Sequence, residues 1–337
     1  MNPKTFKPAW WCRSPHLQTL WPVLIRRAPR VDLKRERIEL PDGDFVDIDW
    51  ARAPDDAAPV VLVLHGLEGS SDSQYARGML QALHRRGLGG AVMHFRGCSG
   101  EPNRLARSYH SGDTGDFAYV VDLLRTRAPD RPIAAVGYSL GGNVLLKYLG
   151  ERASAAPLTA AVAVSVPYLL NRCADRIDQG FSRIYQWELM RRLRHSVVRK
   201  LGRLAMPIDA ARLRRLRRFW DFDEHVTAPL NGFADAEDYY RRSSSRQFLK
   251  SIAVPTLLIH AFDDPFMTPD TPPRPEDLSP AIRPAFSPHG GHVGFVAGPW
   301  PWRADYWLET TIPRFLVPLL KAAPAQSGAA RTVSVAD

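Results

Sequence analysis

The chain of 337 residues contains only three cysteines, Cys12, Cys98 and Cys173, and they are far apart. An odd number at such spacings argues against a disulfide framework and against a zinc site built on a CxxC pair. A run of about 18 apolar residues, which a membrane-spanning helix needs, is also missing. The opening MNPKTFKPAWWCRSPH has no apolar stretch of signal-peptide length. We therefore expect a reduced, cytoplasmic protein.

The ten histidines lack the spacing of metal ligands, because the sequence has no HxH or HExxH pair. No metal and no other cofactor is expected. The sequence also has no recognised nucleic-acid-binding motif, although its net charge is +10. Nucleic acid is therefore not expected as a partner.

The positive charge is local. Residues 183–218 hold twelve Lys or Arg and two acidic residues, so their excess equals the net charge of the whole chain. The remainder of the chain is neutral on balance. This pattern indicates one basic surface rather than a basic protein.

Apolar runs and helical periods alternate along most of the chain. Residues 35–50 are typical of a β-hairpin around Pro41-Asp42-Gly43. Continuous apolar runs predict buried strands, at 60–66, 91–95, 132–139, 159–166 and 255–262. Helical patterns predict helices, at 73–86, 114–127, 141–151 and 304–322. The alternation favours an α/β fold with a mostly parallel central sheet and helices on both faces.

The alternation stops between residues 167 and 251, which are predicted to be helical and basic. We expect a single α/β domain with a helical insertion. The chain would then consist of an N-terminal arm (1–34), the α/β core (35–166 and 252–322), the helical insertion (167–251) and a disordered tail (323–337). In the arm, His16 and Gln18 are polar residues in aromatic surroundings. They either attach the arm to the core or line a pocket.

The strongest motif is GxSxG, which is Gly137-Tyr138-Ser139-Leu140-Gly141 in this chain. It lies between a predicted strand and a predicted helix, the context of a nucleophile elbow. The tight turn projects the hydroxyl above the sheet, and the helix N-terminus favours negative charge beside it. Ser139 is therefore the candidate nucleophile.

A serine nucleophile needs a base, and the base needs an orienting acid. On this type of sheet the acid and then the histidine follow the serine along the chain. Asp264 is the favoured acid because a proline turn follows it directly, with Asp263 as the alternative. His292 is the favoured base because a glycine pair precedes it, with His289 as the alternative.

An acyl-transfer site also needs two N–H donors for the oxyanion. One is expected from the backbone of Leu140, the residue after the nucleophile. The second is expected from the turn His65-Gly66-Leu67-Glu68-Gly69 after the first buried strand. The backbone N–H of Leu67 is the predicted donor.

Six stretches carry a resemblance to a known family, SPHLQTLWP (14–22), HGLEGSS (65–71), FRGCSGEPNRLARSYHSGDTGD (95–116), GYSLGGNVLLKYLGE (137–151), DDPFM (263–267) and GGHVGF (290–295). From about residue 6 to 320 the chain resembles the YheT-type subfamily of α/β-hydrolases. The resemblance implies an α/β-hydrolase fold, a Ser139–Asp264–His292 triad and hydrolysis of carboxylic esters. Animal members are associated with acylglycerol or phospholipid substrates and carry an N-terminal membrane segment, which we do not expect here.

In this fold, the position of the insertion is that of a lid over the active site. Apolar residues recur there at helical spacing, so one face can close over a pocket, and they are Ile184, Trp187, Leu189, Leu193, Val197 and Leu201. Three interpretations of its basic residues stay open. They form a solvated face, dock through 183–218 on the anionic inner face of a membrane, or select a substrate with a negative group.

Together the motifs predict a serine hydrolase that acts on small-molecule acyl esters. A thioesterase with the same residues is an alternative. A non-catalytic protein that binds anionic surfaces through the basic insertion is another.

Overall fold

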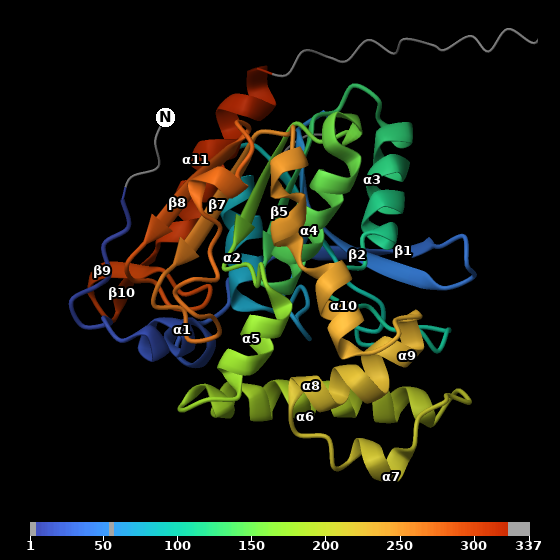
Figure 1. Ribbon diagram of the computed structural model, residues 1–337. Helices are drawn as coiled ribbons and strands as arrows, with labels where there is room; N and C mark the ends of the chain where they lie inside the picture. Colours follow the sequence, from blue (N-terminus) through green and yellow to red (C-terminus); the bar gives the residue numbers. More distant parts are fainter. Residues whose placement is uncertain (1–4, 54–56, 323–337) are drawn as a thin grey trace, which may run out of the picture.

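The structure is a computed structural model that describes residues 5–53 and 57–322 (Figure 1). The tail predicted at 323–337 and the first four residues of the predicted arm lie outside the described residues. An eight-stranded sheet forms the centre, in the order β1-β2-β4-β3-β5-β6-β7-β8. Its strands are β1 (Leu33–Glu39), β2 (Phe45–Ala51), β3 (Val60–Leu64), β4 (Gly89–Met93), β5 (Ile133–Tyr138), β6 (Ala160–Val164), β7 (Thr256–Ala261) and β8 (Ile282–Ser287).

The sheet is mostly parallel, as predicted. Strands β3 to β8 pair in parallel with their neighbours, whereas β1 and β2 form the predicted hairpin and β2 pairs antiparallel with β4. Every residue of β3, β4, β5, β6 and β7 is buried. Continuous apolar strands are stable only when both faces of the sheet are covered.

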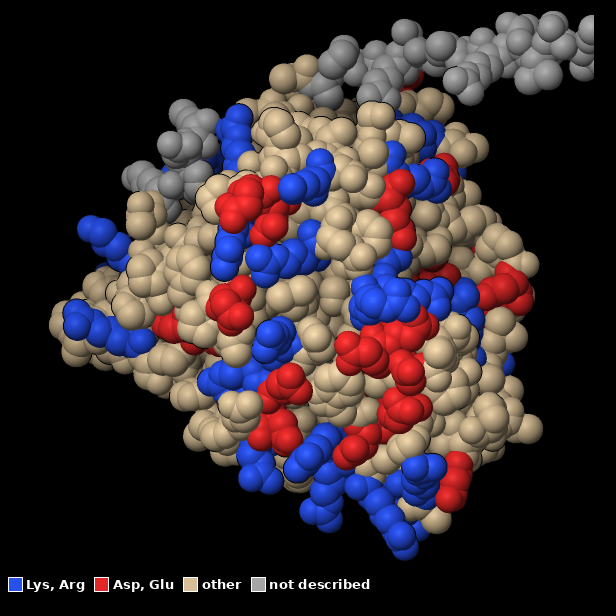
Figure 2. Space-filling model, in the orientation of Figure 1, with Lys and Arg blue, Asp and Glu red and all other residues tan. Residues whose placement is uncertain are grey.

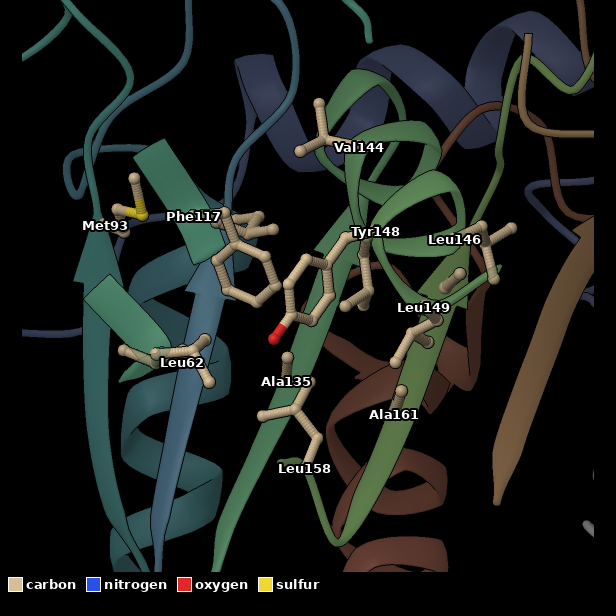
Figure 3. Close-up of a cluster of buried hydrophobic side chains, with 14 of the residues drawn as sticks. Leu62, Met93, Phe117, Ala135, Val144, Leu146, Tyr148, Leu149, Leu158 and Ala161 are labelled. Carbon is tan, nitrogen blue, oxygen red and sulfur yellow. The ribbon is translucent and has the colours of Figure 1, made fainter. Parts of the chain in front are cut away.

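Helices cover both faces. On one face lie α3 (Gly115–Arg127) and α4 (Leu140–Arg152), and on the other α2 (Gln74–His84) and α11 (Trp307–Ala322). Figure 3 shows Phe117 and Tyr148 together in the first of these layers, where their rings meet edge to face with centroids 4.9 Å apart. These buried layers fix the sheet against α4, and so they fix the turn in which Ser139 lies.

The N-terminal arm packs against the C-terminal part of the core. It contains α1 (Pro15–Leu24), which lies near a two-stranded sheet of β9 (Val296–Trp300) and β10 (Arg303–Tyr306). Gln18 is fully buried; its amide nitrogen donates to the carbonyl of Val296 at 2.9 Å and its oxygen accepts from the N–H of Val296 at 2.6 Å. Gln18 therefore attaches the arm to the core, one of the two roles left open.

The C-terminal helix begins later than predicted. Residues 304–306, expected to be helical, belong to β10, and α11 starts at Trp307. The prediction was wrong there because these residues pair with β9 across a turn of prolines and tryptophans. The helical spacing of apolar residues in the sequence does not reveal that pairing.

Residues 167–251 form the helical insertion, which lies at the carboxyl ends of the strands (Figure 1). Its elements are α5 (Leu170–Ile177), α6 (Ser182–Leu201), α7 (Ala210–Leu213), α8 (Phe219–Phe222), the π-helix η2 (Asp223–Thr227), α9 (Ala228–Asn231), α10 (Ala236–Ser243) and the 3₁₀-helix η3 (Ser245–Ser251). Two further 3₁₀ turns lie outside it, η1 (Ala153–Ala155) and η4 (Pro275–Asp277). Over the described ranges, none of the helices has the length and apolar character needed to cross a membrane.

Candidate active site

Ser139 lies in the turn between β5 and α4, with a φ of +52°. A residue other than glycine is rarely found in this left-handed region, and such strain is concentrated at functional sites. The surrounding glycines are needed for close packing. A Cβ on Gly137 would lie 2.5 Å from the carbonyl oxygen of Gly141, and a Cβ on Gly141 would lie 2.5 Å from the carbonyl oxygen of His65.

Three of the predicted side chains form one hydrogen-bonded row. The Nε2 of His292 lies 3.0 Å from the Oγ of Ser139. The Nδ1 of the same ring lies 2.8 Å from the Oδ2 of Asp264, whose carboxyl group is almost completely buried. When the carboxylate of Asp264 accepts a hydrogen bond from Nδ1–H, the imidazole proton is on Nδ1. The other ring nitrogen, Nε2, can then accept the proton of the serine hydroxyl.

Phe266 fixes both members of the acid–histidine pair. Its backbone N–H donates to Oδ1 of Asp264 at 2.9 Å, so both carboxylate oxygens are engaged. Its ring stacks on the imidazole of His292, with centroids 4.0 Å apart and planes 8° from parallel. Sequence reasoning missed this role, although Phe266 stands two residues after the predicted acid.

The loop that carries His292 is attached to distant parts of the chain. The N–H of His292 donates to Oγ1 of Thr19 on α1 at 2.9 Å. The next N–H, that of Val293, donates to Oγ of Ser165 after β6 at 3.0 Å. Sequence reasoning assigned no role to Thr19, although it lies in the motif SPHLQTLWP, or to Ser165, because both act only through tertiary contacts.

The alternative acid and base lie beside the row but not in it. The Oδ2 of Asp263 lies 3.2 Å from Nδ1 of His289, whose side chain is exposed. The Oδ1 of Asp263 accepts from the N–H of Gly291 at 2.9 Å. In the described part of the chain neither side chain has a hydrogen bond to Ser139. Asp263 therefore shapes the loop in which His292 stands.

The turn after β3 is held by a buried histidine. Burial lowers the pKa of His65 to about 3, so the ring is neutral at pH 7. Its Nε2 accepts from the N–H of Phe95 at 3.2 Å, so the proton is on Nδ1, which lies 2.7 Å from the carbonyl oxygen of Gly66. This bond fixes the peptide that joins Gly66 to Leu67.

Most N–H groups of this turn are occupied. That of Gly66 donates to the hydroxyl of Tyr75 at 2.9 Å, and that of Glu68 to the hydroxyl of Tyr109 at 2.8 Å. Over residues 5–53 and 57–322, the N–H groups of Leu67 and Leu140 have no hydrogen-bond partner. Both residues line the same cavity as Ser139.

That cavity has a volume of about 440 Å³ and extends between the sheet and the helical insertion. Ser139 and His292 line it from the core, and mostly apolar side chains of the insertion enclose it, among them Tyr185, Leu189, Leu193, Val197, Phe219, Phe222, Val226 and Leu230. The prediction that Ile184 and Trp187 share this face was wrong. Their side chains are 55% and 62% exposed, because they lie on the outer side of α6.

Three acidic residues interrupt the apolar lining, Glu68, Glu188 and Asp223. Glu68 follows Leu67 and also has a positive φ, of 51°. Burial raises the pKa of Asp223 to about 6, and this carboxyl accepts from the hydroxyls of Thr227 and Tyr240, each at 2.6 Å. Across the described residues, no group of three or more His, Cys, Asp or Glu is arranged to hold a metal ion.

Parallel sheet, strained serine turn and histidine–aspartate pair together define an α/β-hydrolase. Residues 59–299 match the family described as the alpha/beta hydrolase fold, and the chain belongs to that family. Within the family it groups with the YheT-type proteins, as the sequence motifs suggested. It is 47% identical over 311 residues to "Putative esterase YheT" of Escherichia coli (strain K12), and the match covers 91% of each chain.

Two further comparisons are more distant. The chain is 30% identical to "Phospholipase ABHD3" of Mus musculus, over 90% of this chain and 76% of the relative. Its fold is similar to that of the esterase Pf2001 of Pyrococcus furiosus, with a TM-score of 0.53, 16% identity and 94% of this chain covered against 97% of the other. At that identity the structural likeness concerns the fold alone.

Proposed function

We propose that this protein is a serine hydrolase that cleaves carboxylic esters of small molecules through an acyl-enzyme. The observation that carries the proposal is the row of hydrogen bonds from Ser139 through His292 to Asp264 at the wall of a mostly apolar cavity. The names of relatives, one an esterase and one a phospholipase, support the same class of reaction.

In the first half-reaction, the hydroxyl oxygen of Ser139 attacks the ester carbonyl while Nε2 of His292 takes its proton. The tetrahedral intermediate collapses when the same imidazolium protonates the leaving alcohol. An ester bond to Ser139 forms and the substrate's ester bond breaks. Asp264 keeps the imidazole in the required tautomer and stabilises its positive charge.

In the second half-reaction, His292 takes a proton from a water molecule, and the hydroxide attacks the acyl-enzyme. Collapse of this intermediate returns the proton to Ser139 and releases the carboxylic acid. In both halves the N–H groups of Leu67 and Leu140 stabilise the oxyanion. Removing one such donor from an acyl-transfer site costs roughly 3 kcal/mol of transition-state stabilisation.

The shape of the cavity supports an apolar acyl group. Leucine, valine and aromatic side chains of the helical insertion line it, so the insertion acts as a lid that shields the acyl chain from bulk solvent. Phospholipid or acylglycerol substrates remain a proposal from the resemblance. The cytoplasmic location stays a prediction from the sequence.

The test is hydrolysis of p-nitrophenyl esters from acetate to palmitate by the wild type, Ser139→Ala and the control Ser154→Ala. Ser154 is exposed, and a surface Ser→Ala change leaves the site intact. We expect turnover by the wild type and Ser154→Ala and loss of turnover in Ser139→Ala. A matched series of thioesters separates an esterase from a thioesterase.

Labelling by a fluorophosphonate provides a second readout that does not depend on finding the right substrate. A peptide containing Ser139 should carry the label in mass spectrometry. If folded wild-type protein is neither labelled at Ser139 nor active on any ester or thioester, the proposed function is wrong.

A further inference from the structure

Two groups of exposed apolar side chains lie beside the cavity. Three of them lie at the C-terminal end of α1 and three at the N-terminal end of α6. We call these six residues the apolar rim: Val23, Leu24, Ile25, Phe181, Ile184 and Trp187. The exposed fractions of these side chains run from 49% for Phe181 to 70% for Leu24. A single exposed leucine is ordinary, but a contiguous apolar patch marks an interaction site.

The two groups are neighbours in space. His16 of α1 packs on Phe181 with ring centroids 4.3 Å apart, and its Nδ1 lies 3.1 Å from the hydroxyl of Tyr185 on α6. Val23 lines the cavity and is also 55% exposed, so the cavity reaches solvent between α1 and α6. The apolar rim therefore borders, at Val23, the cavity that contains Ser139.

The exposed face of α6 continues the apolar rim and carries an arginine. On the outer side of α6, Ile184, Trp187, Arg191 and Val198 follow one another at helical spacing, and all four are exposed. A helix that presents aromatic, aliphatic and basic side chains together is typical of one that lies in a membrane interface. In Figure 2, basic side chains project from the lower edge of the molecule, where Figure 1 places α6 and α7.

Much of this charge is not neutralised by the protein. Within the described part of the chain, several exposed arginines of the insertion have no acidic partner within 4.0 Å, namely Arg183, Arg203, Arg214, Arg215 and Arg217. Within residues 183–218, the ion pairs involve Arg191, Arg192 and Arg218. The five arginines without an acidic partner can therefore attract an anionic partner.

We propose that the apolar rim and the arginines of residues 183–218 dock on the surface of an anionic phospholipid bilayer. Apolar side chains enter the interface, and the arginines bind lipid phosphates around them. A second copy of the chain fits less well, because an isologous contact would bring the two basic segments together. Membrane docking does not depend on catalysis. Its purpose would be to deliver lipid esters to the cavity, and that purpose rests on the proposed function.

The experiment is co-sedimentation of the full chain with vesicles of phosphatidylcholine alone or mixed with phosphatidylglycerol. One variant, Ile184→Ser with Trp187→Ser, removes apolar contacts, and another, Arg214→Glu with Arg215→Glu and Arg217→Glu, reverses charge. The matched controls are Trp302→Ser, on an exposed tryptophan of the turn between β9 and β10, and Arg283→Glu, on an exposed arginine of β8. All these side chains are exposed, so the variants should fold.

We expect the wild type to bind the anionic vesicles, with binding that weakens as salt rises. Each rim or arginine variant should bind at least about tenfold more weakly, and the controls should bind like the wild type. No binding, equal binding to neutral vesicles, or equal losses in the controls would overturn the proposal. The proposal would also be overturned if light scattering showed that the wild type is a dimer and that the double variant Ile184→Ser with Trp187→Ser is a monomer.

Hydrolysis of p-nitrophenyl acetate is measured on the same samples. It should be unchanged in all four variants, since none of the altered side chains touches the serine row. Vesicle binding by a wild-type protein that is neither labelled at Ser139 nor active on any ester or thioester would leave the docking proposal standing and remove the proposed function.

Discussion

The Oε2 of Glu68, in the turn after β3, accepts a hydrogen bond of 2.6 Å from the hydroxyl of Ser196 on α6. The other carboxylate oxygen, Oε1, accepts from Tyr109 at 2.9 Å. Glu68 directly follows Leu67, whose N–H is a proposed oxyanion donor. A single side chain thus connects the position of the helical insertion with the backbone geometry of the oxyanion turn.

Replacing Ser196 with alanine should weaken this connection selectively. A hydrogen bond to a charged group contributes about 1.5–3 kcal/mol, so kcat/KM for a decanoate ester should fall by about tenfold. Acetate uses the same oxyanion turn, so its kcat/KM should fall as well. Steady-state kinetics on both esters, with Ser154→Ala as control, measure the change; wild-type kcat/KM values for both esters in Ser196→Ala would contradict the coupling.

Asp264 and Asp263 provide a matched pair of substitutions. Asp264→Asn should lower kcat by about 10⁴-fold, because the amide favours the wrong imidazole tautomer. Asp263→Asn keeps an oxygen that can accept from the N–H of Gly291, and its kcat should stay within about tenfold of wild type. Similar losses in both variants would show that the acid has been assigned wrongly.

The buried carboxyl of Asp223 should make stability depend on pH. Its pKa is raised by burial to about 6, above the value of 3.8 for an unperturbed aspartate. Between these values the folded state holds a proton that the unfolded state has lost. The contribution of Asp223 to stability is therefore complete below about pH 4 and is lost as the pH rises through about 6.

Asp223→Asn cannot titrate, and its free energy of unfolding should not show this loss. Relative to wild type, the variant should gain up to about 3 kcal/mol between roughly pH 4 and pH 7. Urea unfolding across this range measures the gain, and Asp221→Asn, at an exposed aspartate, is the control. A difference between variant and wild type that does not change with pH would rule out the titration of Asp223.

Much of the core follows from local patterns. The strands β3 and β5 were predicted nearly to the residue, because an unbroken apolar run suits only a strand covered on both faces. The start of α11 was misplaced because the pairing of β10 with β9 depends on a partner strand. The side of α6 on which Trp187 lies was misjudged, because the helix has apolar residues on two faces and the sequence does not say which face meets the core.

For the candidate site, the sequence determined which residue types were available and in what order. Ser139, then Asp264, then His292 could be selected because strand ends of a parallel sheet meet at one edge, so local motifs there imply proximity. Only the tertiary structure decided the choice of partners. It paired Asp263 with His289, placed Thr19 and Ser165 beside the histidine loop, stacked Phe266 on His292, and turned the apolar rim outward. These contacts join segments far apart in the chain, and their geometry depends on packing that no local pattern encodes.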